Sequence, residues 1–405
     1  MTSNTQQPRQ RDPRLDFFRG MAMLIIFIAH VPNNRFANYI PARFGFSDAA
    51  EMFVFLSGMA AAIAFAGTYR RAGFVTGSAR IGYRCFQLYA THLGMFFLIA
   101  TLAAYANTLV EYPNYIGQLN LWRFFQHTEE SMIGLFSLTY VPNYFDIMPM
   151  YMGVLAMVPL IMLLSRASIR IVPLFCLMLY AAMWLFDLEF LADSMTDRPW
   201  FFNPFGWQII FFTGFCLGTG WIKPPPTSKA LLSVAIVFIV ACVPFAHYPT
   251  WSQVETLGKA RAMLEPFWID KTNLGPLRWL HFMAIVYIMV TLLQGRIWLL
   301  STRIAAPIVK TGQNALPVFF LSMTLSFIAG MILDQIGRST TSLWFVNGVG
   351  ISILMLAAYL FGWFKKKPWV RQQAYTQHTS AVSDLTMKHS DATSLKSELL
   401  KVKAL

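Results

Sequence analysis

The sequence predicts an all-α fold, a polytopic membrane helix bundle of about ten transmembrane helices. Of the 405 residues, 56% are hydrophobic and only 13% are charged, against about 25% charged residues in soluble domains. The apolar residues are gathered in runs of about 20, the length that a helix needs to cross a hydrocarbon core about 30 Å thick. The four cysteines lie in or beside these runs without a CxxC pair, which favours buried thiols over a disulfide framework or a metal site.

Length and hydropathy place the predicted spans in order along the chain. They cover residues 16–32, 49–67, 85–107, 146–165, 169–189, 205–222, 229–247, 277–295, 314–334 and 343–364. The first run leads into His-Val-Pro-Asn-Asn without a small-residue cleavage pattern, so we expect it to remain as a span. We therefore divide the chain into an N-terminal segment (1–14), a membrane domain (15–364) and a polar tail (365–405), for which we expect disorder.

The distribution of charge predicts the orientation in the membrane. Four short loops on the side of the N-terminus (68–84, 165–170, 223–229 and 296–312) hold eleven Lys or Arg and no Asp or Glu. The alternate loops hold nearly all the acidic residues. By the positive-inside rule both ends of the chain are expected in the cytoplasm. The net charge of +13 is then explained by topology and indicates no nucleic-acid partner.

The first span, RLDFFRGMAMLIIFIAH, carries an arginine and a histidine eleven residues apart. On an α-helix Arg19 and His30 would share one face, roughly 16 Å apart along the axis, with Asp16 close to the same stripe. Ionisable side chains inside a span are costly and mark a functional site by default. A neutral imidazole can act as a general base near neutral pH, so we take His30 as the candidate base. The alternative is an interfacial histidine that bonds a carbonyl group.

Three further ionisable residues open later spans at about the depth of His30. They are Glu51 in SDAAEMFVFLSGM, Asp146 in NYFDIMPMYM and His281 in LRWLHFMA. An imidazole with a carboxylate partner recurs where a hydroxyl group is activated, so Glu51 or Asp146 is expected to orient His30. The sequence leaves the choice between them open, and the alternative for each acid is a charge at the outer surface.

Two groups of polar residues fit a donor and an acceptor. Arg80 and Arg84 crowd one basic loop, and we group His92 in the following span and Asn314 in TGQNALPVFF with them as candidates for binding a phosphate-bearing donor. The positive-inside rule would place these arginines there in any case, and Asn314 would serve equally as a helix cap. At the start of another span, the amide and indole groups in FNPFGWQ suit a sugar: Asn203, Trp207 and Gln208. Helix capping and an interfacial aromatic belt are the alternative for these three.

These blocks resemble a known family. The Arg-x10-His spacing and FVFLSG resemble the membrane-bound acyltransferase-3 superfamily. Within it, the blocks AAEMFVFLSG, RIGYRCFQLYATH, FDIMPMY, FNPFGWQIIFFTG and TGQNALPVF are similar to the OpgC branch, in the expected order and over residues 13–364. Proteins of this branch are succinyltransferases that act on osmoregulated periplasmic glucans in the inner membrane of Gram-negative bacteria.

The resemblance implies that His30 and Arg19 are the catalytic pair and that the Arg80-x3-Arg84 region faces an acyl-CoA donor. That arginine pair is spaced one residue wider than the Arg-x-x-Arg form of the superfamily, which weakens the assignment to CoA. The expected partners are membrane lipids, acyl-CoA (succinyl-CoA) as a donor substrate and a periplasmic glucan as acceptor, with His281 beside Asn203 and its neighbours at the acceptor. No permanently bound cofactor is expected.

A secondary transporter is the rival hypothesis, because buried Arg, His and carboxylates also form proton or substrate relays. Against it, the sequence shows no inverted repeat and no pair of interrupted spans in corresponding positions.

Overall fold

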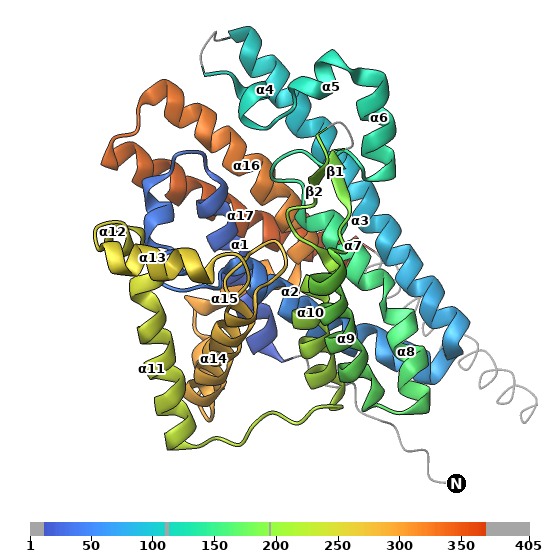
Figure 1. Cartoon of the computed structure of the whole chain (residues 1–405). Helices are drawn as coiled ribbons and strands as arrows, with labels where there is room; N and C mark the ends of the chain where they lie inside the picture. Colours follow the sequence, from blue (N-terminus) through green and yellow to red (C-terminus); the bar gives the residue numbers. More distant parts are fainter. Residues whose placement is uncertain (1–11, 110–112, 194–195, 370–405) are drawn as a thin grey trace, which may run out of the picture.

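The computed structural model describes residues 12–109, 113–193 and 196–369, and these residues are almost entirely helical (Figure 1). The predicted all-α class is therefore confirmed. Most of the predicted tail (365–405) and of the N-terminal segment (1–14) lies outside the described residues. The one regular sheet within the described ranges is a pair of short antiparallel strands, β1 (Leu191–Asp193) and β2 (Arg198–Pro199).

The helices follow one another along the chain with short connections. In the first half they are α1 Pro13–His30, α2 Ala49–Ala61, α3 Gly67–Leu109, α4 Tyr115–Gln118, α5 Trp122–Gln126, α6 Thr128–Ser137, α7 Ile147–Ala156, α8 Val158–Ala167 and α9 Ile171–Phe186. In the second half they are α10 Pro204–Thr219, α11 Lys229–Ala246, α12 Tyr248–Trp251, α13 Glu255–Leu264, α14 Pro276–Leu293, α15 Ala305–Gln313, α16 Ala315–Ile336 and α17 Thr340–Lys365. Short 3-10 helices, η1 (Arg35–Tyr39), η2 (Pro41–Arg43) and η4 (Ile297–Ser301), lie between them.

Helix α1 lies at the centre of the bundle and packs against α2, α15 and α16 (Figure 1). Glycines make its contact with α15 very close. A Cβ atom at Gly20 would lie 2.0 Å from the carbonyl oxygen of Ile308, and one at Gly312 would lie 1.8 Å from that of Asp16. Small residues of this kind let helices approach backbone to backbone inside a membrane. Arg19 and His30 are thus carried on one continuous and tightly held helix, as the spacing predicts.

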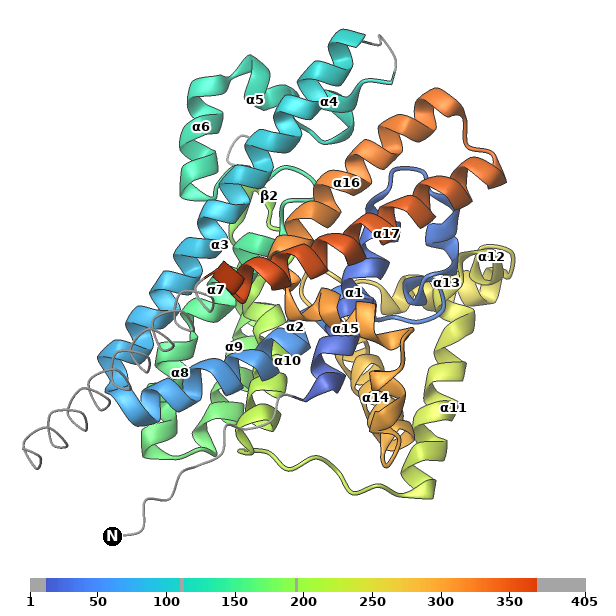
Figure 2. The same ribbon diagram turned by 180° about the vertical axis from the view of Figure 1, so that it is seen from behind.

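Helix α2 begins at a cap that two acidic side chains form. The Asp48 side chain accepts from the Ala50 amide at 2.7 Å, and the Glu51 side chain accepts from the Asp48 amide at 2.8 Å. This reciprocal pair satisfies two amides of the first turn. A π-helical turn, η3 (Ala62–Ala66), follows α2, and α3 is kinked at Gly73, where φ is +81°. In Figure 2 the chain runs from α2 toward the lower left, bends, and returns upward as α3.

Within the described residues, six helical segments are long and apolar enough to span a membrane, so the predicted count of about ten is not confirmed. One of the six, Ala49–Leu109, contains two predicted spans, because the helix continues through the kink. Helices α9 and α10 are only 16 residues long. Helix α1 holds three charged residues, Arg14, Asp16 and Arg19, within its 18. The protein is nevertheless a helical membrane protein by the length and composition of its helices.

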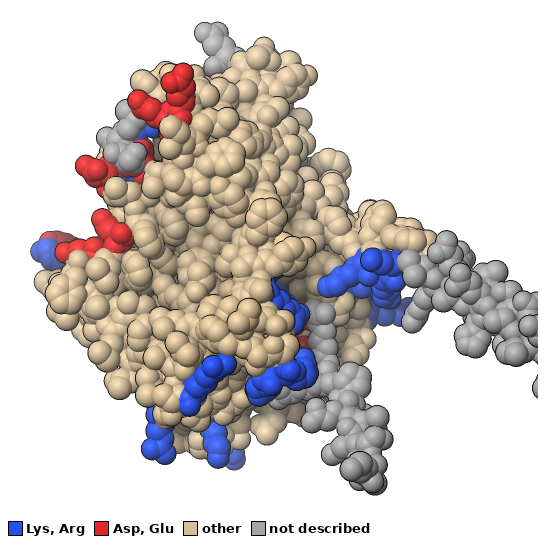
Figure 3. Space-filling view, turned by 90° about the vertical axis from the view of Figure 1, so that its right-hand side faces the viewer, with Lys and Arg blue, Asp and Glu red and all other residues tan. Residues whose placement is uncertain are grey.

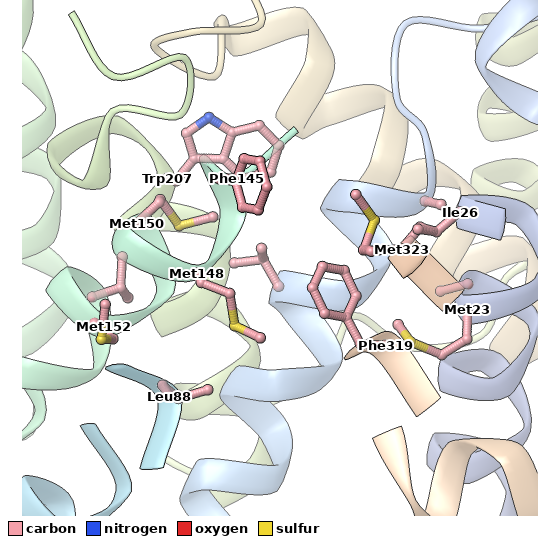
Figure 4. Packing of buried hydrophobic residues seen from close by; sticks show 14 of the residues in the cluster. Met23, Ile26, Leu88, Phe145, Met148, Met150, Met152, Trp207, Phe319 and Met323 are labelled. Atoms are coloured by element: carbon pink, nitrogen blue, oxygen red, sulfur yellow. The ribbon is translucent and has the colours of Figure 1, made fainter. Parts of the chain in front are cut away.

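The core between the helices is rich in methionine and phenylalanine. Figure 4 shows Phe319 and Met323 of α16 lying between side chains of α7, among them Met148, and side chains of α1. Methionine is flexible and fills irregular gaps between helices. All four cysteines are free, and three of them are buried, which agrees with the prediction of unpaired thiols.

Charged side chains separate toward opposite ends of the molecule. On the face drawn in Figure 3, most Lys and Arg side chains gather at the lower end and most Asp and Glu side chains at the upper left. This separation follows the bias of charge among the loops of the sequence.

Candidate functional site

A cavity of about 670 Å³ lies where α1 ends. Its walls come from the last turn of α1, the 37–48 segment, the first turns of α2 and α7, residues 198–202, α12, α13, residues 269–271, α14 and α16. Many elements distant in sequence thus converge on one hollow. The volume falls in the range of small-molecule sites, about 300–1,000 Å³.

His30 is the last residue of α1 and lines this cavity. Its Nδ1 atom donates a hydrogen bond to the carbonyl oxygen of Ile26, at 2.8 Å. A carbonyl accepts only, so this bond places the proton of the neutral ring on Nδ1 and leaves Nε2 as the proton acceptor. Among the described residues, Nε2 has no hydrogen-bond partner. The carbonyl bond proposed as the alternative is therefore present, and it prepares the other nitrogen for general base chemistry.

Tyr144 packs against the His30 ring and lines the cavity beside it. The two rings meet edge to face, with centroids 5.2 Å apart. Tyr144 has a φ of +73°, a left-handed conformation that costs a bulky residue free energy and concentrates at functional sites. Asp146 follows two residues later and lines the same cavity. One short segment thus brings an aromatic ring to the candidate base and a carboxylate to the same cavity.

The carboxylate of Asp146 contacts an arginine, not His30. Its Oδ1 atom lies 3.9 Å from NH1 of Arg198 and accepts from the amide of Phe201 at 3.4 Å. The other terminal nitrogen of Arg198 donates to the carbonyl oxygen of Val141. Asp146 and His30 line the same cavity, as the prediction that they lie near each other requires. The predicted direct contact between them is not formed.

Glu51 is completely buried and belongs to a network of alternating charges. Its Oε1 atom accepts from Nε and NH2 of Arg278, at 2.8 and 2.5 Å, while Lys271 donates to Asp48 at 2.6 Å. NH2 of Arg278 also lies 3.9 Å from Asp48. Burial alone would raise the pKa of Asp48, but the charges of Lys271 and Arg278 hold the pKa below its ordinary value.

Glu51 therefore does not orient His30, as one of the two sequence alternatives supposed. Both of its oxygens are used, one by Arg278 and the other by the amide of Asp48. The backbone carbonyl of Ile26 holds the imidazole instead. Glu51 lies behind the cavity wall and neutralises Arg278, a buried arginine of that wall.

The three residues of FNPFGWQ predicted to meet a sugar are buried and bond to the protein itself. Asn203 caps α10 and donates to the carbonyl of Leu188 at 2.7 Å, and Gln208 donates to the carbonyl of Cys176 at 2.8 Å. The indole of Trp207 donates to the carbonyl of Lys271 at 3.0 Å. None of the three lines the cavity. Trp207 instead holds in place the backbone of a lysine that does.

His281 lies behind the cavity wall. Its Nδ1 atom is 2.8 Å from the hydroxyl of Ser47, and a Cβ atom at Gly45 would come within 2.4 Å of its Nε2. Gly45 and not His281 faces the cavity. The predicted shared depth of His30 and His281 is consistent with this placement, but the ring is separated from the cavity by the 45–47 segment.

Arg19 binds the neighbouring helix α2. It lies eleven residues before His30 on α1, and this separation accounts for its position away from the cavity. NH2 donates to the carbonyl of Leu56 on α2 at 3.0 Å, and NH1 lies 3.8 Å from Asp16. Arg19 does not line the cavity. The structure thus confirms one helix for the Arg19–His30 pair and gives its two members different surroundings.

The candidate donor residues lie away from this cavity. Arg80 donates to the carbonyl of Ala64 at 2.9 Å and to the Thr68 hydroxyl at 2.5 Å, beside the π-helical turn. Arg84 donates to Gln87 at 3.1 Å, and Asn314 donates to the carbonyl of Ala358 at 3.0 Å. His92 is fully buried, and neither ring nitrogen has a hydrogen-bond partner among the described residues. The structure does not bring these four into the cavity of His30.

Sequence reasoning missed the cations of the cavity wall, among them Arg198, Lys271 and Arg278. One signal was present. The positive-inside rule accounts for arginine and lysine in the basic loops, and these three stand in the acidic outer loops or at the outer end of a span. Cations at such positions need another explanation, and the structure supplies it by placing them at the cavity.

Comparison with protein families finds a match to the family described as OpgC protein, over residues 11–366. Comparisons with curated proteins and with solved structures find no match. The family match confirms the resemblance to the OpgC branch, whereas its place within the acyltransferase-3 superfamily stays a prediction. Because the match covers most of the sequence and includes every residue of the cavity wall, this chain belongs to the OpgC protein family.

Proposed function

We propose that this protein is an integral inner-membrane O-acyltransferase that moves a succinyl group from cytosolic acyl-CoA to hydroxyl groups of a periplasmic glucan. Membership of the OpgC family supports a transferase that modifies glucans. One observation carries the proposal: His30 faces a cavity of suitable size and presents an Nε2 atom that is set to accept a proton.

The reaction uses His30 first as a base and then as an acid. A glucan hydroxyl gives its proton to Nε2 while its oxygen forms a bond to the thioester carbonyl carbon. The tetrahedral intermediate then breaks the carbon–sulfur bond, and the imidazolium returns the proton to the departing CoA thiolate. The bond from Nδ1 to Ile26 holds the ring in the required tautomer throughout. We expect Asp146, which lines the same cavity, to accept a hydrogen bond from the acceptor sugar.

Acyl-CoA would dock at the basic end of the molecule, where Arg80 and Arg84 lie. Its pantetheine arm would reach into the bundle toward His30, past residues such as His92 and Asn314. The separation of charge along the molecule supports this arrangement, because the phosphates of CoA need cations (Figure 3). This arrangement of donor and acceptor also gives a reason for the spacing of Arg19 and His30 along α1. The donor arrives from one side of the membrane and the acceptor from the other. Both termini would then be cytoplasmic.

The test is transfer by the purified full-length protein in detergent. Release of CoA thiol and the mass of the glucan would be followed after mixing with succinyl-CoA and a glucan acceptor. We expect one succinyl group on the glucan for each thiol released. Transport of a substrate without any thioester turnover would refute the proposal and favour the secondary transporter. In cells, loss of the gene should remove the acyl group from periplasmic glucans, as measured by mass spectrometry.

A further inference from the structure

The cavity of His30 carries a surplus of positive charge. Among the residues that the structure describes, five cationic side chains line it and two carboxylates do, Asp48 and Asp146. The cations are Arg43, Arg198, Arg261, Lys271 and Arg278. Even with Glu51 counted behind the wall, five positive charges stand against three negative ones. A hollow lined mostly by one sign of charge concentrates ligands of the opposite sign.

Three of the five cations are poor candidates for holding a ligand inside the cavity. Arg278 is held by both of its bonds to Glu51. Arg261 donates to the carbonyl of Phe245 at 2.7 Å and lies over the ring of Trp251. Arg43 is exposed and donates to a carbonyl of its own segment at 3.1 Å. Arg278 and Arg261 are thus held by protein groups and Arg43 faces solvent, which leaves Lys271 and Arg198 as the candidates for a ligand.

Lys271 and Arg198 keep N–H groups for a ligand. Lys271 donates one of its three N–H groups to Asp48. Arg198 donates one hydrogen bond, to a carbonyl, and its separation of 3.9 Å from Asp146 is too long for another. The side chains of Lys271 and Arg198 line the cavity and are 35% and 33% exposed, whereas the side chain of Glu51 is 0% exposed. Both are therefore accessible from the cavity.

The two cations share a wall with the candidate base. Asp146 contacts Arg198 and also accepts from the amide of Phe201. The ring of Phe201 lies 5.8 Å from the Lys271 ammonium group. His30 joins the same wall through its ring contact with Tyr144. The candidate base and both cations therefore line one cavity.

We propose that Lys271 and Arg198 form an anion subsite, which holds the free carboxylate of a dicarboxylic acyl group while the thioester carbonyl at its other end reaches His30. This inference rests on the proposed function. The fork of an arginine and the point charge of a lysine together suit the two oxygens of a carboxylate. An acyl group that ends in a methyl would cover the remaining N–H groups of both cations without bonding them, which gives selectivity for the dicarboxylic donor.

Trp207 contributes to this subsite from behind. Its indole bonds the carbonyl oxygens of Lys271 and Thr272, at 3.0 and 3.1 Å, and so fixes the backbone from which the lysine extends. It is a positioning residue. The same cations would also suit an anionic substituent on the acceptor, and the experiment separates the two sources.

The experiment compares two donors of equal length, succinyl-CoA and butyryl-CoA, on a neutral glucan oligosaccharide with the full-length protein in detergent. The wild type should favour succinyl-CoA in kcat/KM. Lys271→Gln and Arg198→Gln should each lower the ratio of succinyl to butyryl transfer by about 10- to 100-fold, the weight of a lost charged hydrogen bond. Lys271→Arg should keep most of the preference. Lys259→Gln, at an exposed lysine outside the cavity, is the control and should leave the ratio unchanged.

Because both donors are measured on one preparation, a variant that is partly unfolded still gives a valid ratio. An unchanged ratio in both Gln variants would overturn the subsite. So would an equal loss with both donors, or a loss that appears only with an anionic glucan as acceptor. If the wild type transfers from neither donor, the proposed function fails, and the subsite is judged by binding. Monomethyl succinate, and not methyl butyrate, should then raise the unfolding temperature of the wild type but not of the Gln variants, and equal shifts would overturn it.

Discussion

Replacement of His30 by asparagine tests the roles of its two ring nitrogens separately. The Asn side-chain amide can take the place of Nδ1 and keep the bond to the Ile26 carbonyl, now 2.8 Å long. Nothing in His30→Asn replaces Nε2, so the variant should fold and bind the donor but lack the base. A positioned general base contributes about 10² to 10⁴ in rate. At about 1.36 kcal/mol for each factor of ten, this corresponds to about 2.7–5.4 kcal/mol of transition-state stabilisation.

The measurement is acylation of glucan at matched membrane abundance, for His30→Ala, His30→Asn and His30→Gln. All three should lose activity by a similar factor, because neither amide accepts a proton at neutral pH. His247→Asn is a matched control: this histidine also ends a helix, bonds Thr250 through Nδ1 at 2.8 Å, and does not line the cavity. We expect near-normal activity in that control. Substantial activity in His30→Asn would refute the general base and leave His30 as a structural cap on α1.

Three further predictions concern the buried charges, the donor end and the topology. Arg278→Met should lower the free energy of unfolding by about 3–5 kcal/mol, because the buried Glu51 loses its partner, and adding Glu51→Gln should restore most of that loss. Thermal unfolding in detergent measures the stability of both variants, and no recovery in the double variant would contradict the pairing. Arg80→Ala with Arg84→Ala should raise KM for acyl-CoA more than it lowers kcat, whereas a normal KM with a collapsed kcat would mean a structural or catalytic role. A reporter fused within α13 should read periplasmic and one between α10 and α11 cytoplasmic; a cytoplasmic signal from α13 would break the proposed orientation.

The local features of the fold could be predicted because they depend on neighbouring residues. The placement of Arg19 and His30 on one helix follows from the period of the helix. The start of α2 follows from an aspartate and a glutamate three residues apart, which form the reciprocal cap. The number of spans could not be predicted in this way. It depends on whether helices continue through irregular turns, such as the π-helical turn and the kink at Gly73, which hydropathy does not detect.

The partners of the site residues could not be predicted because they come from distant parts of the chain. Glu51 and Arg278 are 227 residues apart in sequence, and Asp48 and Lys271 are 223 apart. Many pairings of acids and cations satisfy the same composition, and only the packing of α2 against α14 selects one of them. The imidazole of His30 could be assigned as a candidate base from its position alone. The carboxylates that lie at a similar depth in the membrane turn out to be partners of arginine and lysine.

The polar groups of FNPFGWQ show why a residue type does not specify a role. Amides and an indole at a helix start suit a sugar, and they suit equally the unpaired carbonyl groups of buried loops. The structure gives Asn203, Trp207 and Gln208 the second kind of partner. Trp207 still acts on the cavity, since it fixes the segment that carries Lys271. A substitution there should therefore alter donor selectivity through the lysine, while a residue that touched the sugar directly would alter affinity for the acceptor.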